Sequence, residues 1–269
     1  MDLRRFLDFA VERENVRIRR EAGEPAPWTH DDVLRRGFFC NVYREDDKTT
    51  RWFRDNIRQH LAGGQSVFAC TVFRWFNRIE SGEVLKPHLL GDWEPATLLP
   101  ELEKLPKIVG AAYMVKSPKG MRKAAGLLQC AEVVRERCLA MRARETLEEL
   151  HAEICEFPYV GRFIAYEIVT DLRHGMMAEA TDINSWASAG PGCARGLNWL
   201  LGTKYVYGRE KHQQQMLAVM REMLPEINDR WPWPDRPWEM REVEHVLCEF
   251  AKYTELQNGK RPKRYWRKS

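Results

Sequence analysis

A carboxylate and an anion-binding turn lie close together near the middle of the chain. Asp182 is a carboxylate that could accept a proton or orient a polar group. A Gly-Pro-Gly turn at residues 190–192 precedes an expected helix that carries Arg195. Such a turn presents unpaired backbone N–H groups to an anion, and an arginine one turn later adds a bidentate clamp. The pattern predicts chemistry beside a bound phosphate group; the alternative is a structural loop with Arg195 on the surface.

The element that must position Asp182 is a helical hairpin at residues 145–173. Apolar residues recur at helical spacing on both sides of residues 156–161. Pro158 ends the first helix because it disfavours the α conformation before it and lacks a backbone donor. Gly161 supplies the freedom that a tight turn needs. The first N–H groups of the second helix predict a phosphate-binding site, and the alternative is an ordinary hairpin of the core.

This hairpin resembles the helix-hairpin-helix element of the DNA glycosylase superfamily. That element has the form Leu-Pro-Gly-Val-Gly, binds the DNA backbone and precedes a catalytic aspartate by about twenty residues. Here the hairpin reads Phe-Pro-Tyr-Val-Gly, with Tyr159 in place of the first glycine, and Asp182 lies twenty-one residues after Gly161. The resemblance implies that DNA contacts come from Pro158, Tyr159, Gly161 and Arg162.

Apolar periodicity predicts an all-α chain, and the resemblance to DNA glycosylases implies a glycosylase-like fold in two lobes with a cleft between them. The 269 residues, 44% of them hydrophobic, suffice for a single domain at 1–269. Helices are expected at 121–141 and 207–224, the latter followed by a rigid aromatic linker at 225–237. No run of about 18 apolar residues occurs and the N-terminus lacks a signal-peptide block, so a cytoplasmic protein without a membrane partner is expected. Seven dispersed cysteines without a CxxC pair argue against a zinc site.

A basic tail is predicted at residues 259–269. Six basic residues and no acid lie between Lys260 and Lys268, with Tyr265 and Trp266 among them. Without these six, acidic residues slightly outnumber basic ones, although the whole chain carries a net charge of +4. This combination suits phosphate contact with stacking, and the alternative is a solvated tail. The tail residues assigned to DNA are Lys260, Arg261, Lys263 and Arg264.

Polar side chains beside apolar helical faces complete the predicted site. On the last expected helix, His245 and Glu249 are four residues apart, which permits a His–carboxylate pair or half of a metal site. The alternative for these groups is structural hydrogen bonding, capping or surface charge, and no metal site is assigned. The residues assigned to the substrate pocket are Asn41, Arg44, Asn77, Arg78, Gly190, Gly192, Asn198, His245, Glu249 and Lys252.

Five segments spread over almost the whole chain share a further resemblance. In order they are FFCNVYREDDKTTRWFRDNI, VFRWFNRIE, FPYVGRFIAYEIVTDLR, DINSWASAGPGCARGLNWLLG and EHVLCEFAKYTELQNGKRPKRY. Together they resemble the alpha-glutamyl/putrescinyl thymine pyrophosphorylase family, which is similar to DNA glycosylases and is associated with phage thymine hypermodification. The related helical domain linked to hydroxymethyluracil DNA kinases shares some of these motifs. Five ordered motifs are more specific than any one of them alone.

The resemblance implies a transferase. An amino acid or amine would displace pyrophosphate from a pyrophosphorylated 5-hydroxymethyl-pyrimidine in double-stranded DNA, in an infected bacterial cell, and a separate kinase would make that substrate. No GxxxxGK[ST] pattern occurs in this chain, which argues against the kinase step itself. The target base would leave the stack, Asp182 would deprotonate or orient the amine, and Arg195 would hold the leaving-group charge. The residues assigned to catalysis are Asp182, Arg195 and Asn184.

Two other functions stay open on the sequence alone. A DNA glycosylase would use Asp182 to promote loss of a modified base, and a non-enzymatic protein would bind DNA through the hairpin and the tail. No resident cofactor is predicted. Magnesium accompanying pyrophosphate and a monovalent cation at the hairpin are the two ions left open.

Overall fold

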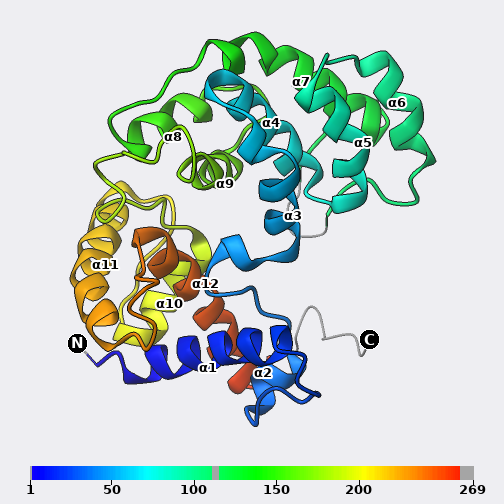
Figure 1. The fold of residues 1–269 in the computed structure, drawn as a ribbon. Helices are drawn as coiled ribbons and strands as arrows, with labels where there is room; N and C mark the ends of the chain where they lie inside the picture. The colour runs from blue at the N-terminus through cyan, green and yellow to red at the C-terminus, as the bar shows by residue number, and fades with distance from the viewer. Residues whose placement is uncertain (1, 111–114, 261–269) are drawn as a thin grey trace. The chain divides into compact units, whose positions relative to one another are not determined.

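The regular elements of the protein are helical wherever the structure describes the chain. The computed structural model describes residues 2–110 and 115–260, and these contain helices and no β-strand (Figure 1). The all-α fold predicted from the sequence is therefore confirmed. The chain divides into two compact units, one from residues 1–47 and 183–269 and the other from residues 48–182. It passes from the first unit to the second after Asp47 and returns after Asp182.

The second unit is built around helix α4. Its helices are α3 (Lys48–Asn56), α4 (Gly63–Phe76), α5 (Ile79–Leu90), α6 (Pro95–Lys104), α7 (Lys123–Ala140), α8 (Leu147–Cys155) and α9 (Arg162–Leu172), with a 3₁₀ turn η2 (Arg58–His60). α4 packs against α7 and α9 and is buried from Ser66 to Phe76 (Figure 1). A helix buried on all sides carries apolar residues all round, which is why α4 also contains the strand-like run Val67–Val72.

A buried ion pair holds the hairpin helix α9 to α4. Arg74 on α4 donates to both carboxylate oxygens of Asp171 on α9, each at 2.5 Å, and the two side chains are 1% and 0% exposed. The Arg58 guanidinium lies 3.5 Å from Asp171, and Arg74 also donates to Thr50 Oγ1 at 3.3 Å. Buried charges persist only with such partners, so this bidentate pair fixes where α9 lies on the core of its unit.

The first unit is built around the last helix. Its helices are α1 (Arg4–Glu21), α2 (Asp32–Arg36), α10 (Pro191–Leu201), α11 (Glu210–Arg230) and α12 (Met240–Gln257), with a 3₁₀ turn η1 (Arg44–Asp46). α12 packs against α10, α11 and α1. Phe6 of α1 meets Trp238 and Phe250 edge to face, with ring centroids 5.9 and 5.5 Å apart. These aromatic contacts join the N-terminal helix to the C-terminal half of the chain.

Helix α11 continues past the point where the sequence analysis ends it. The predicted boundary between this helix and a rigid linker at residue 225 is wrong, because α11 runs through Pro225 to Arg230. The aromatic segment begins at Trp231, whose ring packs against Trp233 and Trp238. Pro225 lies on the exposed side of the helix, whereas Leu224 and Ile227 on either side of it are buried. A proline inside a helix costs about 3 kcal/mol, and burial of two large aliphatic side chains offsets a cost of that size.

Candidate functional site

The predicted hairpin is present as two helices, α8 and α9, joined by residues 156–161. Thr146 and Glu149 form a capping box that begins α8, and the His151 ring bonds to the carbonyl oxygen of Arg162 at 3.1 Å. Gly161 is the N-cap of α9 and has no side chain with which to cap it. No heavy atom lies within 4 Å of the position a Cβ would take there. The backbone at Gly161 is therefore open to a ligand.

The left-handed residue of this hairpin is not the one that the sequence suggests. Gly161 has an ordinary φ of −84°, so its predicted role as the flexible turn residue is wrong. Tyr159 instead adopts φ +66°. The assigned DNA contacts, Pro158, Tyr159, Gly161 and Arg162, lie together on this turn and at the start of α9, and their binding to DNA stays a prediction.

Asp182 lies at the beginning of α8. Its two carboxylate oxygens accept hydrogen bonds from the backbone N–H groups of Leu147, at 2.7 Å, and Glu148, at 3.0 Å. The side chain is buried, with 8% exposed. Together with Thr146 it satisfies N–H groups that a helix start leaves unpaired. The sequence analysis did not anticipate this capping role, which accounts for an aspartate here without catalysis; the catalytic assignment stays a prediction.

The expected anion site at the start of α10 already holds a carboxylate. Glu244 of α12 accepts a hydrogen bond from Gly190 N at 3.2 Å. A Cβ at Gly192 or at Gly196 would lie under 3.0 Å from Cys248 Sγ or the Leu247 carbonyl oxygen, respectively. The glycines of this turn and helix therefore allow α10 and α12 to approach each other. The assignment of Gly190 and Gly192 to a bound phosphate is not supported by this packing.

The other residues predicted near this turn have partners within the first unit. Arg195 is 54% exposed and forms an ion pair with Glu255 at 3.2 Å. Asn198 accepts from Tyr205 N at 2.7 Å and donates to Tyr205 O at 3.0 Å, which orders the loop after α10. Asn184 is exposed. Arg195 and Asn184 thus belong to the first unit and Asp182 to the second.

Four of the predicted pocket residues do meet, at the loop before η1. The His245 ring bonds to the carbonyl oxygen of Asn41 at 3.0 Å. Glu249 accepts from the backbone N–H of Cys40 at 2.9 Å and from Lys252 Nζ at 2.6 Å. Arg13 of α1 donates to Asn41 Oδ1 at 2.6 Å. We call Asn41, His245, Glu249 and Lys252, with Asp47, the α12 polar cluster.

Asp47 is the member of the α12 polar cluster that sequence reasoning missed. It accepts a hydrogen bond from Asn41 N at 3.1 Å. Burial raises the pKa of Asp47 to about 6 and lowers the pKa of His245 to about 3. The cluster thus combines a neutral imidazole with a carboxylate whose pKa lies near neutrality, as a proton acceptor requires. The sequence did contain a sign of this role, since Asp46 and Asp47 are consecutive acids close to Asn41, Arg44 and Glu45. The side chain of Arg44 is buried.

Acid should destabilise the protein partly through His245. The pKa of His245 is about 3 in the folded protein and has an ordinary value of 6.5 in the unfolded chain. Between these two pH values only the unfolded chain protonates His245, so unfolding becomes easier as the pH falls. Asp47 acts oppositely between about 6 and 3.8, because there the folded state holds the extra proton. His245→Gln keeps a donor for Asn41 and removes only the first effect. Thermal unfolding at about pH 7 and about pH 5 should show a smaller loss of Tm in this variant than in the parent; equal losses would contradict the assignment.

Asn77 and Arg78 have structural positions in the second unit. Asn77 is the left-handed C-cap of α4, with φ +43°, and its Oδ1 accepts from Arg74 Nη1 at 3.0 Å. Arg78 precedes α5 and pairs with Glu80 at 2.8 Å. The structure therefore places these two residues in a different unit from the α12 polar cluster.

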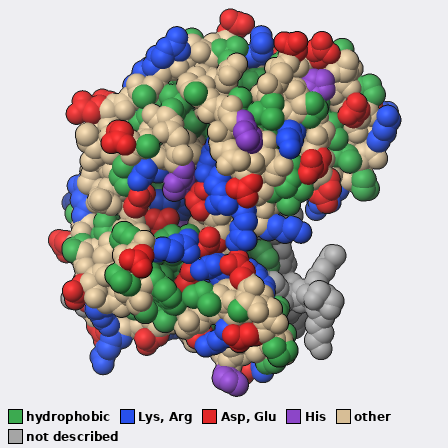
Figure 2. Space-filling view, in the orientation of Figure 1, with side chains coloured by type: hydrophobic (Ala, Val, Ile, Leu, Met, Phe, Trp, Pro, Cys, Tyr) green, Lys and Arg blue, Asp and Glu red, His purple; other side chains and the backbone are tan. Residues whose placement is uncertain are grey.

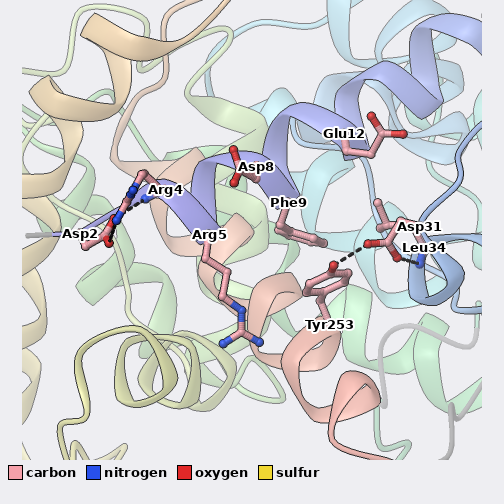
Figure 3. A pocket seen from close by; sticks show the side chains of 9 residues that line it. All are labelled: Asp2, Arg4, Arg5, Asp8, Phe9, Glu12, Asp31, Leu34 and Tyr253. Atoms are coloured by element: carbon pink, nitrogen blue, oxygen red, sulfur yellow. Dashed lines mark hydrogen bonds and ion pairs between the residues drawn. The ribbon is translucent and has the colours of Figure 1, made fainter.

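A surface pocket lies elsewhere in the first unit. It has a volume of about 620 Å³ and is lined by α1, by Asp31 and Leu34, and by Tyr253 (Figure 3). The Tyr253 hydroxyl donates to Asp31 across one side of it, at 2.5 Å. None of the residues assigned from the sequence lines this pocket.

Charged residues on the drawn face of the molecule are intermingled. Figure 2 shows Lys and Arg beside Asp and Glu on this face, without one continuous basic patch. At the tail, Lys260 pairs with Glu255 at 2.6 Å, and the assigned residues Arg261, Lys263 and Arg264 lie outside the described residues. In the part of the chain that the structure describes, no helix is long and apolar enough to span a bilayer. Nor do three or more His, Cys, Asp or Glu side chains gather there as metal ligands would.

Comparison with known proteins shows that this chain is similar to part of a 5-hmdU DNA kinase. A family model described as the helical domain of 5-hmdU DNA kinase matches residues 2–261. A 5-hmdU DNA kinase of Bacillus phage SP10 is 24% identical over 300 aligned residues, which cover 94% of this chain and 46% of that protein. The chain thus spans about half the length of this relative. No solved structure matches it.

Proposed function

This chain belongs to the family described as the helical domain of 5-hmdU DNA kinase, and from that membership we propose that it acts in phage DNA thymidine hypermodification. The match over residues 2–261 carries the proposal, because the relative's name specifies a modified deoxyuridine in DNA. The matched part of the family is its helical domain, and this chain contains no phosphate-binding GxxxxGK[ST] pattern. Both points favour a step other than phosphoryl transfer.

The proposed step is transfer of an amine or amino acid to DNA. The amine nitrogen attacks the methylene carbon on C5 of the pyrimidine, and the carbon–oxygen bond to pyrophosphate breaks. Pyrophosphate leaves with the electron pair of that bond, and the proton lost by nitrogen passes to a base. The protein must therefore bind DNA, hold the target base outside the stack and provide a proton acceptor.

The hairpin is the proposed DNA contact. Gly161 leaves its backbone open, and the N-terminus of α9 carries the partial positive charge that favours a phosphate. Arg162, the first residue of α9, is exposed and adds a full positive charge. The ion pair between Arg74 and Asp171 holds this helix on the core of its unit, so the contact is preorganised.

Asp47 is the proposed proton acceptor. The pKa of Asp47 is raised to about 6, while both oxygens of Asp182 are already engaged by the N–H groups of α8. A general base contributes about 10²–10⁴-fold to rate. We therefore expect Asp47→Asn to slow transfer by about that factor. Asp182→Asn should retain transfer and lose about 0.5–2 kcal/mol of stability, because an amide NH₂ then faces a backbone donor.

Mass spectrometry of digested DNA tests both assignments. Duplex DNA carrying pyrophosphorylated 5-hydroxymethyldeoxyuridine is incubated with the protein and a mixture of amino acids and polyamines, and thermal unfolding of each variant is measured in parallel. An amine-bearing nucleoside supports the transferase. If folded Asp182→Asn is inactive while Asp47→Asn is active, the proton acceptor is Asp182.

A DNA-binding module without catalysis is the second candidate function. The observation that favours it is the partial match, since the chain corresponds to less than half of the phage kinase and to a helical domain of it. It predicts salt-dependent DNA binding with unchanged nucleosides in the same assay. Abasic sites would instead indicate a glycosylase.

A further inference from the structure

Tyr159 has a backbone conformation that its own fold does not explain. Two residues other than glycine, Asn77 and Tyr159, have positive φ within the described ranges. Asparagine tolerates the left-handed region, and Asn77 additionally caps α4 and accepts a hydrogen bond from Arg74. A bulky aromatic residue at φ +66° is strained, by of order 1–3 kcal/mol.

Packing does not compensate for the strain at Tyr159. The side chain is 50% exposed, and within the described residues it makes no hydrogen bond or ring contact. Glycine would adopt the same conformation at no steric cost. Within the described residues, no packing or hydrogen bond of the tyrosine side chain therefore offsets this strain.

The surroundings of Tyr159 indicate what its ring could contact. Phe163, in the first turn of α9, is 54% exposed, and Arg162 next to it is exposed as well. The segment from Phe157 to Phe163 contains no acidic residue. Exposed aromatic rings next to a cation suit stacking on a nucleobase, with the cation on the adjacent phosphate. These residues flank Gly161 in the sequence, and the position of a Cβ at Gly161 has no heavy atom within 4 Å.

We propose that Tyr159, with Phe163, stacks on an unstacked base of the DNA while the backbone of the hairpin contacts the phosphates. This inference rests on the proposed function for its DNA ligand and adds a base-contacting group to it. The left-handed conformation turns the chain at Tyr159 and leaves the ring exposed on the hairpin. The favourable stacking is gained only when DNA is bound, and the strain is carried by the free protein.

Replacing Tyr159 by glycine separates base stacking by the tyrosine ring from phosphate contact by the hairpin backbone. Tyr159→Gly should fold with an equal or higher Tm, because it relieves strain, although it also adds freedom to the unfolded chain. Its affinity for duplex DNA containing hydroxymethyluracil should fall about 5- to 150-fold, which is the range for one lost stacked base. The slope of log Kd against log salt should not change, since the phosphate contacts remain. Tyr159→Phe should bind as the parent does.

The binding experiment uses fluorescence anisotropy with 2-aminopurine at and beside the modified position. A matched control is Tyr207→Ala, which removes a tyrosine of similar exposure from the first unit and should leave affinity unchanged. Tyr159→Asn, whose side chain tolerates the left-handed region, replaces the glycine variant if that variant does not fold. Parent-like affinity in the folded variant, whether Tyr159→Gly or Tyr159→Asn, overturns the stacking proposal, and so does loss of binding in Tyr159→Phe. If the parent protein itself binds no DNA, the proposed function fails instead.

Discussion

Asp171→Ala is expected to lose about 3–5 kcal/mol of unfolding free energy, the largest single effect that we predict in the second unit. The substitution leaves the Arg74 guanidinium, 1% exposed, without the carboxylate that receives two of its hydrogen bonds at 2.5 Å. Arg58, 3.5 Å from the same carboxylate, loses an opposite charge as well. An uncompensated buried cation is costly because protein cannot replace its water. Since typical domains are stable by about 5–15 kcal/mol, this loss removes a large fraction of the stability of such a domain.

Denaturant unfolding monitored by circular dichroism measures this loss. The surface pair of Arg78 and Glu80 provides the matched control, because Glu80 is largely exposed and Glu80→Ala should cost no more than about 1 kcal/mol. Replacing both partners, as Arg74→Met with Asp171→Leu, should recover much of the loss, since no unpaired charge then remains from this pair. A stable Asp171→Ala protein would mean that Arg74 and Asp171 are not desolvated as a pair. Their ion pair would then not be what holds α9 against α4.

Gly196→Ala is expected to destabilise the first unit by about 1–3 kcal/mol or more, although alanine is the better helix former by about 1 kcal/mol. The new methyl group would lie under 3.0 Å from the carbonyl oxygen of Leu247 and would also crowd its backbone carbon atoms. A backbone group cannot rotate away as a side chain can. α10 and α12 would therefore separate, and the buried contacts of Leu197 and Leu247 would loosen.

Gly175→Ala is the comparison for this second prediction. A Cβ there would meet nothing closer than 3.8 Å, and its φ lies outside the left-handed region, so the change should be close to neutral. Thermal unfolding of the two variants side by side gives the difference. Equal Tm values would show that α10 and α12 can move apart without loss, and that the close approach at Gly196 is not required.

The local elements were predictable because their signals lie within a few residues of one another. Apolar residues at spacings of three and four predicted the helices at α7, α8 and α12, and Pro158 predicted the end of α8. Asn77 and Arg78, which the sequence assigned to the pocket, directly follow the aromatic helix α4. Such signals act over one or two helical turns, which is also why the end of α11 was misjudged, since Pro225 is a strong local signal that packing overrides.

The candidate site was less predictable, because its partners are distant in the sequence. Nothing in the spacing indicates that Glu244 occupies the N-terminus of α10, or that Asp182 caps α8. Tyr159 was recognised as a departure from a pattern, but its left-handed conformation became visible only in the folded hairpin.

The sequence by itself determined an all-helical chain, the position of the hairpin and a group of polar residues on α12. The tertiary structure alone decided which charges are buried as pairs, as with Arg74 and Asp171, and which glycines serve packing, as with Gly196. The physical reason is the separation along the chain of the groups that interact. Helix formation depends on backbone hydrogen bonds and side chains a few positions apart, whereas desolvation and close packing depend on groups that only the folded chain brings into contact.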